Sequence, residues 1–232
     1  MQRFYVTFPL PIDVKLTDPM ILSQMVRVLR VKIGEHIILF NGDGPETEYE
    51  IQTIEKKSIG LRWIGRTEPK TENKKTITLY QWMPNKYEKI EYILQKWVEI
   101  GIKKFVFFRS ERSQKLLLSP SKIERFQTIA REALEQCGWL IMPEIYYLEA
   151  FPHIEEAFCW THILLDTVGT TRHMSEFATL QDIGIWVGPE WGWSESERIK
   201  MNSYGFIFAR FWERIMRTET AGIVIAFSLL FI

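Results

Sequence analysis

The chain has 232 residues, of which 46% are hydrophobic and 25% are charged, and its formal net charge at pH 7 is zero. This composition is typical of a globular protein with a sizeable core, in one large domain or two small ones. No apolar run reaches the roughly 18 residues of a membrane span, and no basic, apolar leader opens the chain, so a cytoplasmic protein is expected. Cys137 and Cys159 lack metal-type spacing, and neither a disulfide nor a metal site is expected.

The charges are distributed unevenly along the chain. Met1 to Glu68 holds 9 basic and 9 acidic residues, whereas Pro69 to Glu135 holds 14 and 8, and Gln136 to Ile232 holds 6 and 12. A basic region on a neutral protein still supplies surface that neutralises phosphates, because counterion release depends on local charge. The basic middle segment therefore indicates either an RNA-binding surface or ordinary solvated helix faces.

The N-terminal region is rich in short β-type runs. They span Phe4 to Phe8, His36 to Phe40, Glu48 to Glu55 and Ile59 to Gly65, and they predict a small, mostly antiparallel barrel. A single helix is expected over Thr17 to Leu29, because Thr17 or Asp18 can cap it and Pro19 suits its first turn. The wholly polar segment Pro69 to Lys75 predicts a linker.

Strands and helices alternate beyond this linker. The predicted elements are Thr76 to Trp82, Lys86 to Ile100, Lys103 to Phe108, Pro120 to Gln136, His162 to Asp166, Ile183 to Val187, Phe206 to Ala209, and a buried helix in the apolar run from Ala221. Such alternation favours an α/β domain with a mainly parallel sheet. We therefore predict domains over 1–68 and 76–232, joined by the linker 69–75. Ligand sites in such sheets lie beyond the carboxyl ends of the strands.

Two motifs follow predicted strands of the second domain. Gly188 to Glu197 turns at glycine and proline, and Ser194 with Glu197 forms a capping box that starts a helix. Arg214 to Ala221 opens the final helix, with Thr218 as the expected cap. Backbone N–H groups and arginines at such a helix start suit an anion or a carboxylate.

The order of these motifs resembles the RsmE family of 16S ribosomal RNA uridine-N3 methyltransferases, a branch of the knotted SPOUT methyltransferases. The resemblance extends through most of the chain, in the short motifs Arg27 to Arg30, Phe40 to Gly42, Gln95 to Gly101, Ser110 to Ser113 and Glu132 to Gly138. It implies an N-terminal PUA-like β-barrel that contacts RNA, and a C-terminal SPOUT α/β domain with a deep trefoil knot that binds S-adenosylmethionine between three loops. It also implies a homodimer acting on 16S ribosomal RNA in the small ribosomal subunit.

The resemblance assigns candidate residues to each role. The expected cofactor-binding residues are Leu165, Val187, Gly188, Pro189, Glu190, Gly192, Ile215, Met216, Arg217, Thr218, Thr220 and Ala221. Arg214 and Arg217 are expected to hold uridine oxygens or an RNA phosphate, with pairing to Glu190 or Glu213 as the alternative. Glu190 either orients Arg217, accepts a proton through water, or is an exposed turn residue. The expected RNA-binding residues are Arg27, Arg30, Lys32, Arg112 and Ser113.

Three tryptophans depart from the family pattern. Trp191 and Trp212 replace glycines of the two cofactor motifs, and Trp139 replaces an arginine. Each indole at the cofactor motifs either lines the pocket by stacking or fills it and abolishes binding. The sequence therefore leaves two hypotheses, an active methyltransferase and a cofactor-free relative that binds ribosomal RNA or serves in ribosome assembly.

Overall fold

The structure is a computed structural model of the whole chain, and it describes residues 1–68, 73–109, 116–153, 161–168 and 171–231. The chain divides into two compact units. The first contains residues 1–72 and 134–142, and the second contains residues 73–133 and 143–232. Within the described residues, no helix is long and apolar enough to cross a bilayer.

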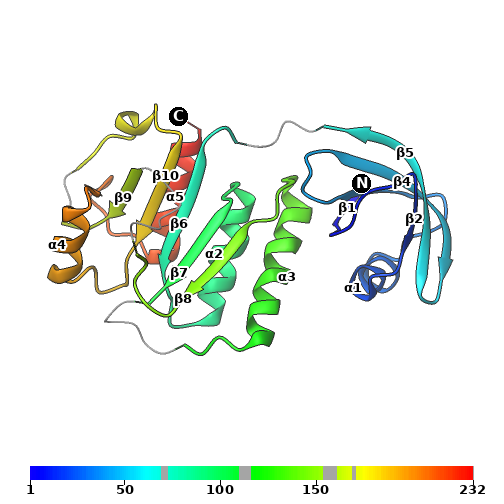
Figure 1. Cartoon of the computed structure of the whole chain (residues 1–232), viewed down its shortest axis with the longest axis horizontal. Coiled ribbons are helices and arrows are strands. Elements are labelled where there is room, and N and C mark those ends of the chain that lie inside the picture. The colour runs from blue at the N-terminus through cyan, green and yellow to red at the C-terminus, as the bar shows by residue number, and fades with distance from the viewer. Residues whose placement is uncertain (69–72, 110–115, 154–160, 169–170, 232) are drawn as a thin grey trace. The chain divides into compact units, whose positions relative to one another are not determined.

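The first unit contains a five-stranded sheet in the order β1-β3-β4-β5-β2 (Figure 1). Its strands are β1 (Gln2–Tyr5), β2 (Asp13–Leu16), β3 (His36–Phe40), β4 (Glu46–Glu55) and β5 (Ser58–Thr67). The pairs β3–β4, β4–β5 and β2–β5 are antiparallel, whereas β1 joins β3 in parallel. Alternate apolar side chains of these strands, such as Leu39, Ile51 and Leu61, enclose one core. This alternation places the polar residues on the opposite face of the sheet.

The predicted helix over Thr17 to Leu29 differs from the observed one. Asp18 caps α1 (Pro19–Ser23), and its carboxylate accepts from the backbone N–H groups of Met20 and Ile21. The chain then continues as the π-helix η1 (Gln24–Leu29), and Arg30 ends it in the left-handed conformation with φ of 54°. Arg27 therefore belongs to the π-helical segment, whereas Arg30 lies just beyond it.

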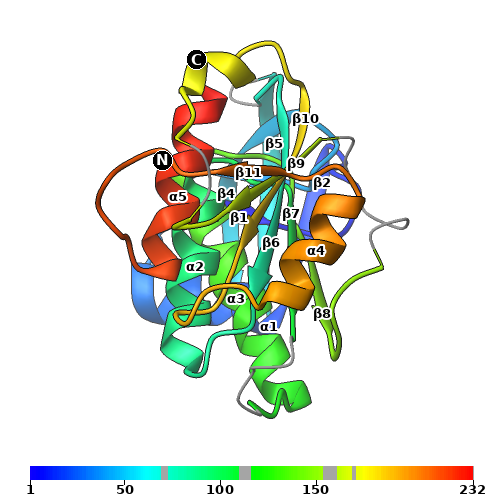
Figure 2. The same cartoon turned by 90° about the vertical axis from the view of Figure 1, so that its left-hand side faces the viewer.

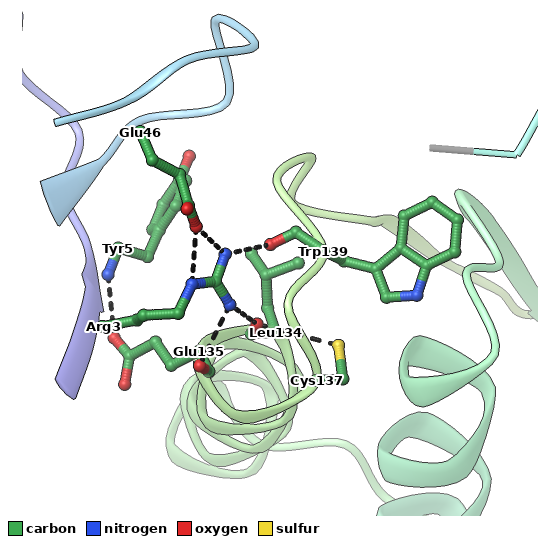
Figure 3. A network of polar contacts seen from close by, with 7 residues as sticks. All are labelled: Arg3, Tyr5, Glu46, Leu134, Glu135, Cys137 and Trp139. Atoms are coloured by element: carbon green, nitrogen blue, oxygen red, sulfur yellow. Dashed lines mark hydrogen bonds and ion pairs between the residues drawn. The ribbon is translucent and has the colours of Figure 1, made fainter. Parts of the chain in front are cut away.

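A polar network joins β1 to the last turn of α3 (Pro120–Cys137) inside the first unit (Figure 3). Arg3 donates from Nε to Glu46 and from its terminal nitrogens to the carbonyl oxygens of Leu134, Glu135 and Trp139, at 2.6–3.2 Å. The Glu135 side chain accepts from the backbone N–H of Tyr5 at 3.0 Å. The guanidinium thus satisfies carbonyls at the negative end of the helix, which have no partner within the helix itself.

The second unit contains a six-stranded sheet in the order β11-β9-β10-β6-β7-β8, with every pairing parallel. Its strands are β6 (Thr76–Trp82), β7 (Lys104–Phe108), β8 (Glu144–Leu148), β9 (Thr161–Leu165), β10 (Asp182–Val187) and β11 (Ile207–Ala209). Its other helices are α2 (Tyr87–Glu99), the short η3 (Met174–Phe177), α4 (Glu195–Ser203) and α5 (Thr218–Leu230). The mainly parallel α/β arrangement expected from the sequence is confirmed.

Helices cover both faces of this sheet, with α2 and α5 on one side and α4 on the other (Figure 2). On the α4 side, Met201 packs with Trp186, Leu164 and Phe206 in an aromatic-rich core. On the other side, α5 approaches α2 so closely that a Cβ atom at Gly222 would lie 2.1 Å from the indole of Trp97. These contacts fix the start of α5 beside the carboxyl ends of the strands.

Candidate functional site

The loop after β10 is shaped by the packing of Trp193. A Cβ atom at Gly188 would lie 2.7 Å from the Trp193 ring, so only glycine leaves room for the indole at this position. Trp193 is buried, and its Nε1 donates to the carbonyl oxygen of Leu165 at 3.0 Å. This hydrogen bond ties the loop after β10 to the end of β9.

The start of α4 is anchored to the same strand end. Ser194 and Glu197 form the predicted capping box, in which the Ser194 side chain accepts from the Glu197 N–H and the Glu197 side chain accepts from the Ser194 N–H. The buried carboxylate of Asp166, directly after β9, pairs with Arg198 at 2.9 and 3.0 Å. The start of α4 is thus fixed by the predicted capping box and by an ion pair to the end of β9 that no sequence motif reveals.

A third segment follows β11 and leads into α5. The helix begins at Thr218, and its N-cap is Arg217, which forms no side-chain capping hydrogen bond. The expected cap at Thr218 is therefore wrong, because this residue already has helical geometry. Without a capping side chain, the first N–H groups of α5 are available to an anionic ligand group.

These three segments, together with Asn85, Lys86 and Lys89 around the start of α2, line a cavity of about 1080 Å³. Its lining includes Arg214 and the predicted cofactor residues Leu165, Val187, Gly188, Pro189, Glu190, Gly192, Ile215, Met216, Arg217, Thr218 and Ala221. Thr220 is not part of the lining. The walls are formed by strand ends, turn backbone and the first turns of α5, so residues from two distant sequence motifs come together at one site.

The charged residues of the cavity are only partly paired. Glu190 forms an ion pair with Lys89 of α2, and Lys89 lies 3.8 Å from Glu219. Arg217 is largely exposed and lies 3.9 Å from Glu219. Within the part of the chain that the structure describes, Arg214 is exposed and forms no ion pair. Glu190 is thus bound to a lysine that no sequence pattern singled out, whereas Arg214 is free to contact a ligand.

The two unusual tryptophans also line the cavity without occupying it. Trp191 is 78% exposed and Trp212 is 39% exposed. An indole that filled the cavity would be buried, and the remaining volume compares with the roughly 300–1,000 Å³ of small-molecule sites. The geometry therefore favours pocket lining over pocket filling.

Three of the predicted RNA-binding residues belong to the first unit. Arg27, Arg30 and Lys32 are exposed in the first unit, and none of them forms an ion pair with another described residue. Arg112 and Ser113 lie outside the described residues.

Comparisons with known protein families identify the class to which this protein belongs. Residues 71–230 match the RNA methyltransferase domain family, and residues 25–62 match the RNA methyltransferase PUA domain family. An α/β domain with an open cavity at its strand ends, together with these matches, is that of an RNA methyltransferase.

Individual relatives narrow this class. Ribosomal RNA small subunit methyltransferase E 2 of Borreliella burgdorferi is 31% identical over 212 residues, which cover 88% of this chain and 85% of the relative. The corresponding enzyme of Bacillus subtilis is 27% identical, with 85% and 82% coverage. The Neisseria gonorrhoeae enzyme, solved with bound S-adenosylmethionine, superposes with a TM-score of 0.87 at 26% identity, over 97% of this chain and 95% of that one. The chain belongs to the ribosomal RNA small subunit methyltransferase E family.

Proposed function

We propose that this protein is an S-adenosylmethionine-dependent methyltransferase that methylates N3 of a uridine in 16S ribosomal RNA. The observation that carries this proposal is the open cavity between the ends of β9, β10 and β11 and the start of α5. It is lined by the cofactor motifs and is occupied by neither Trp191 nor Trp212. Family membership over most of the chain supports the same activity.

The residues of the cavity fit this cofactor. Apolar side chains such as Val187 and Ile225 provide walls for its less polar parts, and the uncapped N–H groups at the start of α5 suit its carboxylate. Turn residues at Gly188 and Gly192 keep the loop backbone close to the cavity. When bound, S-adenosylmethionine supplies a methyl group on a positively charged sulfur.

The protein's own residues position the uridine, remove its N3 proton and stabilise the resulting negative charge. Methylation replaces the N3–H bond of uridine with an N3–methyl bond, and bound S-adenosylmethionine would supply the methyl group from its sulfonium. Arg214 and Arg217 hold the uridine oxygens or an adjacent phosphate, and their positive charge stabilises the anion left when N3 loses its proton. Glu190, held by Lys89, accepts that proton through a water molecule.

Both domains of the chain take part in the proposed function. Residues 1–68 form a PUA-like β-barrel that binds RNA through Arg27, Arg30 and Lys32, together with Arg112 and Ser113. Residues 69–75 link it to a SPOUT domain over 76–232, which carries a deep trefoil knot. The protein acts in the cytoplasm as a homodimer on the small ribosomal subunit, and it uses no metal. The five-stranded sheet of the first unit and the exposure of its three basic side chains support the RNA-binding role.

Isothermal titration of the purified protein with S-adenosylmethionine tests the cofactor step. The active enzyme binds at micromolar concentrations, whereas a cofactor-free relative that only binds ribosomal RNA shows no heat at millimolar cofactor. Exposed Trp191 favours the first outcome, because its ring leaves the cavity open. If binding is absent, the enzyme hypothesis fails and the assembly role replaces it.

A further inference from the structure

The lining of the cavity includes two solvent-exposed indoles, those of Trp191 and Trp212. Trp191 is 78% exposed, and it forms none of the aromatic contacts found among the described residues. Most of the surface of a bound small ligand is shielded from water, so the walls around a cofactor are mainly buried side chains such as Val187 and Ile225. Trp191, by contrast, is mostly exposed to solvent, so its ring is accessible to a macromolecular substrate.

Trp212 is held in place by a short chain of aromatic contacts. Its ring meets Phe211 edge to face with centroids 6.1 Å apart, and Phe211 meets Phe177 in the same way at 5.7 Å. Phe177 is buried, so these contacts attach Trp212 to the core. On the other loop, the Gly192 N–H donates to the Pro189 carbonyl at 2.9 Å, which closes the turn that carries Trp191. Both indoles are therefore presented by ordered local structure.

Unpaired cations accompany the indoles. Lys86 and Arg214 line the same cavity, both are exposed, and neither forms an ion pair with any described residue. The neighbouring acidic groups are engaged, since Glu190 pairs with Lys89 and Glu213 lies 3.8 Å from Arg210. Aromatic rings combined with free cations are the features by which proteins bind single-stranded nucleic acid, with bases stacked on rings and phosphates beside cations.

We propose that Trp191 and Trp212 form a stacking surface that holds the base of the target nucleotide, extruded from the RNA, at the mouth of the cofactor cavity. Lys86 and Arg214 bind the phosphates beside it. A base inside folded RNA is inaccessible to the methyl donor, and stacking on the indoles offsets part of the free energy of its extrusion. This inference rests on the proposed methyltransferase function and identifies the substrate-binding residues of that same site.

The test compares Trp191→Ala and Trp191→Phe with the wild type. Equilibrium dissociation constants are measured for small ribosomal subunits that lack the modification, and separately for S-adenosylmethionine. Stacking predicts that Trp191→Ala weakens binding to the subunits roughly 5- to 150-fold. Trp191→Phe restores most of the loss, because a phenyl ring also stacks, and cofactor affinity stays within about twofold for both variants. Tyr204→Ala, which removes an exposed aromatic ring outside the cavity lining, is the matched control and changes neither constant.

The salt dependence of subunit affinity distinguishes base stacking from contacts with phosphates. Arg214→Gln lowers the slope of log affinity against log salt by about one, whereas Trp191→Ala leaves that slope unchanged. Unchanged subunit affinity in Trp191→Ala would overturn the proposal, and so would a loss of cofactor affinity alone, which would assign the indole to the adenine of the cofactor. If the wild type binds no cofactor, the methyltransferase function fails, but the subunit affinities still decide whether Trp191 stacks on RNA.

Discussion

Gly222→Ala is expected to destabilise the second unit through the contact between α5 and α2. The added Cβ atom would lie 2.1 Å from the Trp97 ring and 3.1 Å from a methyl group of Val187, whereas carbon atoms pack best at about 3.5–4.0 Å. Trp97 is fully buried and cannot move without disturbing the core. Overpacking of this kind costs about 3 kcal/mol, and the better helix propensity of alanine returns about 1 kcal/mol. The free energy of unfolding should therefore fall by about 2 kcal/mol.

Urea unfolding of the full chain measures this change, and titration with S-adenosylmethionine reports its effect on the site. Cofactor affinity should also fall, because Ala221 and Ile225 on the same helix line the cavity. Gly65→Ala is the matched control, since its added Cβ atom meets nothing within 4 Å, and its stability should stay within about 0.5 kcal/mol of the wild type. A Gly222→Ala protein as stable as the wild type would refute the packing argument.

Other substitutions test further contacts. Arg3→Met should lower the free energy of unfolding of the first unit by about 3 kcal/mol, because it leaves the mostly buried carboxylate of Glu46 without its partner. If adding Glu46→Gln to this variant restores no stability, loss of the ion pair is not the cause. Ser194→Ala should cost about 1 kcal/mol through the lost capping box, and an unchanged urea midpoint would contradict this. Burial lowers the pKa of His162, so its contribution to stability is full above the unfolded pKa near 6.5 and is lost as pH falls below it. The stability of wild type relative to His162→Phe should therefore decrease between pH 7.5 and 5.5, and a constant difference would argue against this role.

Local patterns in the sequence predicted the features whose cause is local. The capping box of Ser194 and Glu197 is confirmed because both partners lie within one helical turn. Apolar runs predicted β6 and β10, which are almost wholly buried. By contrast, β8 (Glu144–Leu148) was missed; it is an edge strand of the sheet, and none of its residues is buried. The π geometry of η1 was missed because its apolar spacing also fits an ordinary α-helix.

Contacts between distant segments were beyond sequence reasoning. Lys89 and Glu190 are 101 positions apart, and the sequence around either residue gives no sign that the two form an ion pair. The hydrogen bond from Trp193 to Leu165 and the ion pair of Asp166 with Arg198 likewise depend on the neighbouring positions of β9 and β10 in the sheet. Side-chain positions are needed to decide whether the indoles of Trp191 and Trp212 fill the cavity, and a single sequence does not determine them.

Nucleoside mass spectrometry tests uridine-N3 transfer most directly. Small ribosomal subunits that lack the modification are incubated with the protein and S-adenosylmethionine, and their RNA is digested to nucleosides. The predicted result is 3-methyluridine, which forms only when both protein and cofactor are present. Its absence from subunits incubated with protein that has bound the cofactor would contradict the assigned reaction, and a different methylated uridine would contradict the N3 position.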